Sequence, residues 1–254
     1  MNLLLPGIAA AYLLTFARIG TLMMLLPGLG EQSVSPRIRL AFALLVSLIL
    51  FPMVRPLLPM QGAALAAPGL ISLLIGELLI GLVLGLTVRM VLAALQTTGV
   101  IVSQQLGLSY AMTVDPTQGG QQAALGNFLM MLGITLILAT DLHHVALDAI
   151  GRSYVMLPPD GVLAMGEAAQ LALRAMARGF LLAVQISAPF IAFGILFNVG
   201  LGVLSRLMPQ MQVFFIAVPA SVLIGMLILF GSLGIMMSVF LDDIGRYLGA
   251  LTGR

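Results

Sequence analysis

The sequence predicts an all-α, integral membrane-complex protein made of long, kinked and proline-broken hydrophobic helices that pair into hairpins. Of the 254 residues, 61% are hydrophobic and 8% are charged, whereas a soluble domain has about 25% charged residues. The mean hydropathy of +1.15 means that the chain has more apolar side chains than one globular core can bury. Several apolar stretches reach the roughly 20 residues that cross a bilayer as a helix, and prolines interrupt others. We therefore expect a membrane protein.

The composition excludes several classes of function. The chain has no Cys, so disulfides, thiolate metal sites and Cys nucleophiles are absent. A net charge of +2 without a basic or aromatic stripe argues against nucleic-acid binding. The sequence contains no nucleotide-binding glycine loop, metalloprotease helix, nucleophile elbow or paired carboxylates. We expect no enzymatic activity, no cofactor and no metal.

Aromatic residues that mark a membrane interface are scarce. The chain has no Trp and only four Tyr, whereas belts of both usually mark the two interfaces of a spanning protein. The shortage indicates that some of these helices pack against other protein rather than against lipid.

The first apolar segments differ in length. Leu3–Leu26 is predicted to form a complete helix, which the Pro and Gly residues after it end. Arg39–Phe51 follows Ser35 as the expected N-cap and Pro36 as the first helical residue. Because Pro52 follows directly, we expect this second helix to be too short to span a bilayer.

A third helix, predicted over Gly69–Thr98, carries two charges within an apolar stretch. Glu77 and Arg89 are more than three helical turns apart, so they cannot pair with each other on a straight helix. We favour a partner for each on a neighbouring helix or subunit, and a proton relay is the alternative. Gly81 and Gly85 are spaced to permit close helix approach.

The second half of the chain contains a further series of apolar segments. Leu163–Arg178 is amphipathic and is expected to lie on a protein or membrane surface. Pro189 predicts a kink or break in the long helix that follows, and the last two segments form a hairpin. The predicted helical segments are Ala123–Ala139, Val145–Met156, Leu163–Arg178 continuing directly into Gly179–Leu204, and Val213–Phe240.

Between the two halves lies the longest polar, turn-rich run of the chain, Gln104–Gln122. Asp115 is its only charged residue, Pro116 prevents a helix from continuing, and glycines follow. Irregular backbone cannot face lipid, so this run must be exposed to water or covered by protein. We expect a single domain, 1–254, with a first half 1–103, a loop 104–122 and a second half 123–254.

Polar residues at two helix ends are the remaining candidates. Asp141, His143 and His144 could form a metal or proton site or serve a membrane-embedded enzyme, but we favour a polar anchor at a helix end. Arg206 and Gln210 lie where the last hairpin turns and are expected to cap it.

These motifs together resemble one family over nearly the whole chain. Its most specific piece is the Ser-Arg-Leu-Met-Pro-Gln turn that ends at Gln210. The segments that carry the resemblance are Leu106–Ala111, Val114–Pro116, Gly119–Gln122, Leu125–Phe128, Asp141–His144, Leu157–Pro158, Asn198–Gln210 and Phe214–Pro219. The pattern is similar to that of the FliR family, the R-type components of type III export gates. The absence of a charged element before Asp115 favours its flagellar branch over the homologous injectisome branch.

The resemblance implies a core subunit of the flagellar type III export gate. Such a subunit assembles with P-type and Q-type membrane proteins into a conduit for unfolded flagellar subunits, and it acts together with a B-type switch protein. It would lie in the bacterial inner membrane at the flagellar basal body, with part projecting to the periplasmic side. The segment 107–122 would plug the closed pore, through Gly107, Ser109, Tyr110, Met112, Asp115, Pro116, Gly119, Gly120, Gln121 and Gln122. The alternative from the residues alone is a small-molecule transporter with a broken-helix site.

Overall fold

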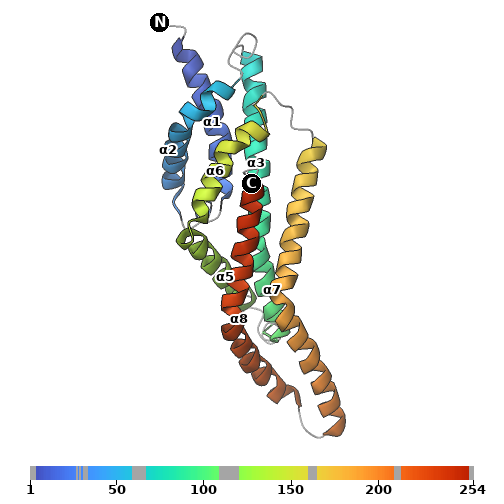
Figure 1. Cartoon of the computed structure of the whole chain (residues 1–254). Coiled ribbons are helices and arrows are strands. Elements are labelled where there is room, and N and C mark those ends of the chain that lie inside the picture. The colour runs from blue at the N-terminus through green and yellow to red at the C-terminus, as the bar shows by residue number, and fades with distance from the viewer. Residues whose placement is uncertain are drawn as a thin grey trace. The chain divides into compact units, whose positions relative to one another are not determined.

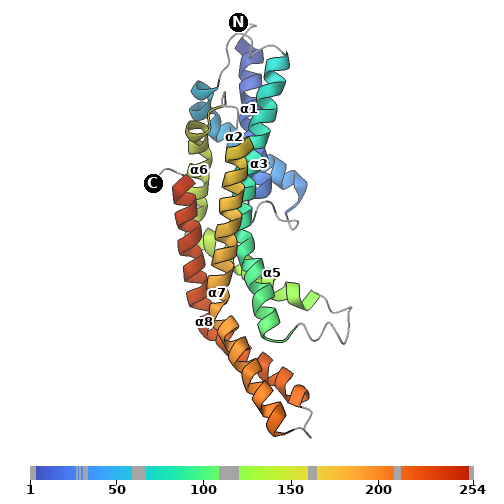
Figure 2. The same ribbon diagram turned by 90° about the vertical axis from the view of Figure 1, so that its right-hand side faces the viewer.

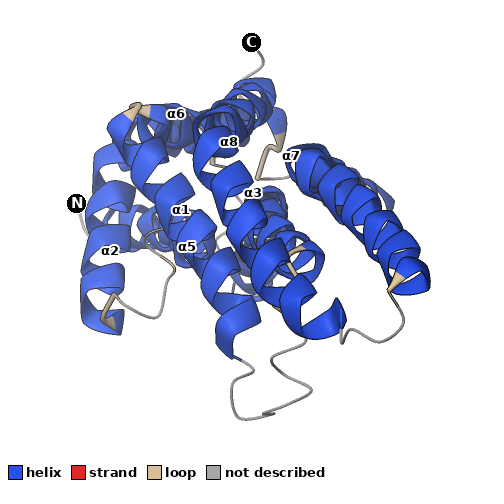
Figure 3. Ribbon diagram, turned by 90° about the horizontal axis from the view of Figure 1, so that it is seen from below, coloured by secondary structure: helices blue, strands red, loops and turns tan. Residues whose placement is uncertain are grey.

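The computed structural model describes residues 4–26, 28, 30, 34–58, 67–108, 120–159, 165–208 and 213–251. These residues form helices joined by short connections and contain no strand (Figures 1 and 3), which confirms the predicted all-α class. The described elements are α1 (Leu4–Leu25), α2 (Pro36–Val54), the 3-10 turn η1 (Arg55–Leu57), α3 (Ala67–Gln105), α5 (Gly120–Ala139), α6 (Leu142–Met156), α7 (Met165–Leu207) and α8 (Val213–Leu251).

The chain divides into two compact units, and each is built from separate parts of the sequence. The first unit takes its described residues from 1–91, 138–177 and 245–254. The second takes its described residues from 92–137 and 178–244. The helices α3, α7 and α8 therefore each contribute to both units.

In the first unit, α1 packs against α2, and α2 packs against α6. The beginning of α3 runs beside α1 in the same direction (Figures 1 and 2). The hydroxyl of Tyr12 donates a hydrogen bond to the carbonyl of Leu44 at 3.0 Å, and its ring meets that of Phe51 edge-on. Buried aliphatic side chains such as Leu14 and Ile80 fill the interior, and each stabilises the unit by about 1.5–3 kcal/mol.

The helix α2 is longer than the sequence indicated. It begins at Pro36, after Ser35 in an extended conformation, as predicted, but the Ser35 side chain makes no capping hydrogen bond. It then continues through Pro52 to Val54, so the expected end at Phe51 is wrong. A proline removes only one hydrogen bond of the ladder, and here it does so in the last turn, where the helix is ending. With η1 the segment covers 22 residues, which is long enough to cross a membrane.

The helix α7 is unbroken at Pro189, where the sequence predicted either a kink or a break. It joins the amphipathic segment to the apolar one and runs through Pro189 as a single helix of 43 residues. The helices α7 and α8 both bend along their length (Figure 1), which is how a long helix accommodates an internal proline without breaking.

The predicted hairpin of α7 and α8 is present in the second unit. The helices run antiparallel (Figure 1), and Arg178 near the start of this part of α7 accordingly bonds to Asp243 near the end of α8. Phe190 of α7 and Phe240 of α8 are fully buried, as are Leu95 and Leu129 of the neighbouring helices α3 and α5. The core of this unit therefore lies between four helices.

Five described helical segments are long and apolar enough to cross a membrane. A sixth is possible if α5 and α6, which are separated by a short break, count as one span. Their length and hydropathy agree with the membrane class predicted from the composition.

Candidate functional site

The run between α3 and α5 is called the central segment here, and its root is the end of α3 at residues 103–108. A regular helix cap holds this root. The amide of Leu108 donates to the carbonyl of Ser103 at 3.0 Å, and the amide of Gly107 donates to that of Gln104 at 3.1 Å. Gly107 has φ 76°, the left-handed conformation that ends many helices. These two bonds and this conformation define the Schellman motif, which satisfies carbonyls left free at a helix end.

Side chains of the second unit fix this root in place. Leu106 is fully buried, and its carbonyl accepts a hydrogen bond from the hydroxyl of Ser221 on α8 at 2.9 Å. Gly225, one turn further along α8, lies so close to the Leu106 side chain that a Cβ there would collide with it. Gly194 of α7 packs in the same way against the side chain of Gln105. The chain therefore leaves α3 from a fixed position between α7 and α8.

The return of the chain is fixed as well, because α5 crosses α3 in close contact. A Cβ on Gly99 would collide with the backbone of Gly126. Further along α5, Gly133 lies against Leu95 of α3 and Phe240 of α8. Small residues at such a crossing let two backbones approach until their atoms touch.

The structure locates only part of the predicted plug. Gly107 lies in the helix cap, and Gly120, Gln121 and Gln122 belong to the first turn of α5. Gln104 and Gln105, which were expected to begin the loop, are still in α3. The described helices thus leave a shorter connection than 104–122. The other predicted plug residues lie outside the described residues: Ser109, Tyr110, Met112, Asp115, Pro116 and Gly119.

A second polar site lies in the first unit and is centred on Glu77. Both Glu77 and Arg18 of α1 are completely buried and form a two-point ion pair. The Nε of Arg18 donates to one carboxylate oxygen at 2.6 Å, and its Nη2 donates to the other at 2.9 Å. Glu77 therefore has its partner on a neighbouring helix of the same chain, one of the arrangements expected for it.

The remaining donor of Arg18 joins this pair to α6. Its Nη1 bonds to the carbonyl of Ser153 at 3.1 Å and to that of Leu157 at 2.9 Å. The guanidinium also lies 4.0 Å from the ring centre of Tyr154, whose hydroxyl donates to the carbonyl of Thr15. Arg18 thus neutralises Glu77, places a cation at the carboxyl end of α6 and stacks on an aromatic face.

The sequence analysis did not identify Arg18 as a site residue. The available signal was that two opposite charges, Arg18 and Glu77, each stand in a strongly apolar predicted helix. A buried charge needs a partner, so two such helices are expected to meet. The close approach does occur: a Cβ on Gly81 would lie 2.5 Å from the Arg18 carbonyl, and Gly85 packs on Leu25.

The other predicted polar residues are less enclosed. Arg89 is exposed on α3 and forms no ion pair with another described residue. Arg206 is exposed in the last turn of α7, where a cation complements the helix dipole. Gln210 lies outside the described residues.

The histidine turn opens α6. Asp141 precedes the helix with φ 58°, and its carboxylate lies 3.5 Å from Nδ1 of the exposed His144. The rings of His143 and His144 are 4.1 Å apart, and the ligand atoms of all three residues lie within 4.8 Å of one another. They could approach one metal ion, but two of the three are exposed and the fourth ligand of a typical structural zinc site is missing among the described residues.

A further ion pair joins α7 to α8 in the second unit. Arg178 and Asp243 form a two-point contact, with Nη2 to Oδ1 at 2.8 Å and Nε to Oδ2 at 3.0 Å. The sequence analysis named neither residue as part of a site. Each lies where a polar or amphipathic segment borders an apolar one, and charged residues at such borders are usually exposed. Their pairing was therefore not predicted from the sequence.

Comparison with known proteins identifies the family. The model of the family described as bacterial export proteins, family 1, matches residues 9–247. The flagellar biosynthetic protein FliR of Caulobacter vibrioides is 41% identical over 239 residues, covering 94% of each chain. The FliR protein of Bacillus subtilis is 30% identical over 86% of this chain and 84% of its own. That of Escherichia coli is 28% identical over 84% and 80%.

The match extends over both compact units and over the central segment between α3 and α5. With its apolar helices, the chain is a membrane-embedded component of the flagellar export apparatus, with a role in flagellum biogenesis and protein export. It belongs to the bacterial export protein family 1, the family of the flagellar biosynthetic protein FliR.

Proposed function

We propose that this chain is a non-enzymatic core subunit of the flagellar type III protein export gate in the bacterial inner membrane. In this proposal it forms, with P-type and Q-type membrane partners, the conduit for unfolded flagellar subunits. The segment between α3 and α5 closes that conduit at rest. The observation that carries the plug is the fixed root of this segment in the second unit.

The anchoring at both ends supports a plug that moves without its base. Leu106 is buried and bonded to Ser221, and α5 begins again at Gly120 and crosses α3 at Gly99. Residues 109–119 connect these two points and contain Asp115 as their only charge. A polar segment with one charge can hydrogen-bond inside a protein pore, and moving it leaves few buried charges without partners.

Partners are supported by the amount of apolar surface on the chain. Large aliphatic side chains are exposed along α2 and α7, including Ile49 at 72%, Leu196 at 73% and Leu207 at 73%. So many exposed apolar side chains are expected to be covered by lipid or by other protein. Because the chain has no Trp and few Tyr to mark lipid interfaces, we assign a large part of it to protein partners.

Native mass spectrometry of the chain expressed with its neighbouring genes tests the assembly. We expect a stable complex with one copy of this chain and several copies of two smaller membrane proteins. A folded monomer or homodimer would contradict the proposal and favour a small-molecule transporter.

The plug requires a separate test within the assembled complex. Residues 109–119 are replaced by a Gly-Ser segment of equal length, so that α3 and α5 stay connected. We expect normal assembly and an increased ion conductance of the membrane. The control is the same type of replacement at residues 160–164, which connect α6 to α7. If the conductance equals that of the unaltered complex, the plug role is contradicted, whereas the proposed assembly is not affected by this result.

A further inference from the structure

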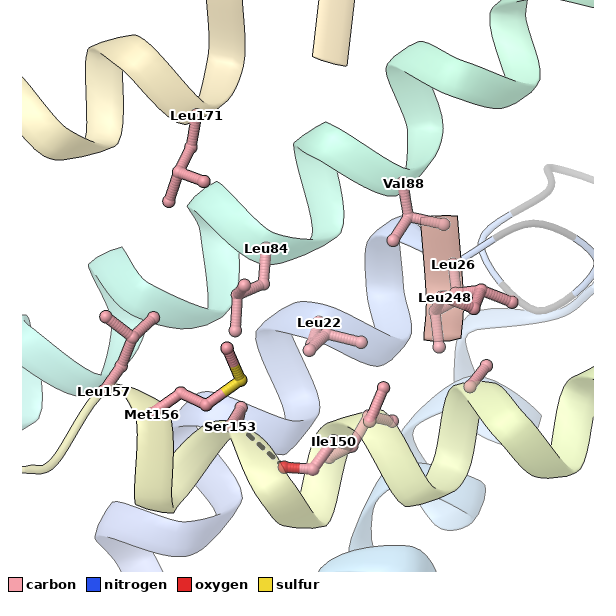
Figure 4. Close-up of a pocket in the computed structure, with 12 residues that line it drawn as sticks. Leu22, Leu26, Leu84, Val88, Ile150, Ser153, Met156, Leu157, Leu171 and Leu248 are labelled. Carbon is pink, nitrogen blue, oxygen red and sulfur yellow. Dashed lines mark hydrogen bonds between the residues drawn. The ribbon is translucent and has the colours of Figure 1, made fainter. Parts of the chain in front are cut away.

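The first unit contains an apolar cavity (Figure 4), and two residues of its lining, Ser153 and Leu157, are those whose carbonyls bond to Arg18. Its volume is about 150 Å³, and it is bordered by α1, α3 and α6 and by the ends of α7 and α8 that belong to this unit. The aliphatic side chains that border it include those of Leu22, Leu84, Ile150 and Leu171. Met156, 53% exposed, lies at its edge, so the cavity is partly open to the surroundings.

The cavity offers a water molecule at most one hydrogen-bond acceptor, the Ser153 hydroxyl. Ser153 has the only polar side chain among the residues that line it, and its hydroxyl already donates to the carbonyl of Ile150 at 2.7 Å. The carbonyls of Ser153 and Leu157 are occupied by Arg18. A buried water needs two to four hydrogen-bond partners, whereas an apolar cavity of roughly 150 Å³ remains dry and accepts a ligand such as benzene or xenon.

We propose that this cavity binds hydrocarbon, and that its occupant is the end of a membrane lipid's acyl chain. Two of the helices that border it, α1 and α3, are long and apolar enough to cross a membrane. In a membrane, acyl chains are therefore the hydrocarbon available to this cavity wherever protein partners leave it open. The opening beside Met156 admits an unbranched chain, and the flexible Met side chain adapts to it.

An occupied cavity would also support the ion pair. The same segment of α6 supplies the cavity wall and the two carbonyls that accept from Arg18. A chain end that packs against Ile150 and Met156 therefore holds the end of α6 against α1 and α3. The cavity is distinct from the central segment, whose root lies in the second unit.

The test uses the purified complex in nanodiscs that contain phosphatidylglycerol with a photoreactive diazirine at the end of one acyl chain. After irradiation, we expect mass spectrometry to find cross-links on peptides that line the cavity, in particular around Ile150–Leu157. Ala149→Phe should fill the cavity and reduce these cross-links at least tenfold. Val155→Phe is the matched control on the same helix, because Val155 is 71% exposed and does not line the cavity.

Other outcomes decide against the proposal. Equal labelling in Ala149→Phe and Val155→Phe would show that the probe reacts only with the outer surface, and would overturn the site. If Ala149→Phe does not assemble, Ala146→Leu at the same cavity replaces it. Thermal stabilisation by benzene in detergent without lipid cross-links would assign the cavity to small free hydrocarbons and overturn the lipid as occupant.

Discussion

Arg18 and Glu77 form a completely buried, two-point ion pair that joins α1 to α3. The third nitrogen of the guanidinium is used as well, since it bonds to two carbonyls at the end of α6. Every charged atom of the pair therefore has a partner within the first unit. A buried ion pair of this kind adds little stability compared with apolar residues, but losing one member leaves a charge without a partner.

Removing one member of this pair is expected to destabilise the protein strongly. Glu77→Gln leaves the Arg18 charge buried and uncompensated, which costs about 3–5 kcal/mol. The double variant Arg18→Met/Glu77→Leu removes both charges and should recover most of that loss, apart from the two α6 carbonyls that lose their donor. The measurement is the yield and thermal unfolding of the complex in detergent. A double variant no more stable than Glu77→Gln would show that the uncompensated charge of Arg18 is not the main cause of the loss in stability.

The cap at the end of α3 makes a prediction for Gly107. Its φ of 76° is unfavourable for residues with a Cβ, so Gly107→Ala should cost about 1–2 kcal/mol. Gly107→Asn should cost less, because Asn tolerates this conformation. Thermal unfolding measures both, and hydrogen exchange of residues 103–108 shows where the loss occurs. Equal stability of the Ala and Asn variants would mean that the conformation is not what limits this site.

Removing one charge of the Arg178–Asp243 pair should destabilise the protein less than removing one charge of the buried Arg18–Glu77 pair. The two side chains are 34% and 19% exposed, so water partly compensates for a lost partner. Asp243→Asn keeps the shape but removes the charge, and we expect a loss of about 1–3 kcal/mol, measured by thermal unfolding. Asp148→Asn is the control, since its pair with Arg152 is more exposed and should contribute less than about 1 kcal/mol. A larger effect at Asp148 than at Asp243 would contradict this ranking.

The sequence predicted the class of the fold and its hairpin but not the lengths of its helices. Composition alone established the membrane class, because so few charges cannot cover a soluble surface. Pro52 was given too much weight, since it removes one hydrogen bond from a helix that neighbouring bonds still support. The partner of Glu77 lies 59 residues away in the chain, and no local pattern encodes that distance.

In the central segment, too, the sequence did not reveal how individual residues are held. Gly107 was interpreted as part of a flexible plug, whereas it ends α3 through a defined cap. A single glycine after a helix fits either interpretation, because the two differ only in the hydrogen bonds around it. The hydrogen bond from Ser221 to Leu106 could not be predicted for a different reason, because it joins residues far apart in the chain.

The crossing of α3 and α5 gives the sharpest test of the packing in the second unit. In an open helical position, Gly→Ala stabilises a helix by roughly 1 kcal/mol, because it restricts the unfolded chain and improves helix propensity. At Gly99 the new Cβ would collide with the backbone of Gly126, so Gly99→Ala should destabilise the protein instead. Gly76→Ala is the matched control on the same helix, since a Cβ there meets nothing within 4 Å. Thermal unfolding of the two variants should therefore shift in opposite directions. A shift upward in both would show that α5 does not cross α3 at Gly99, and would remove the fixed return that the proposed plug requires.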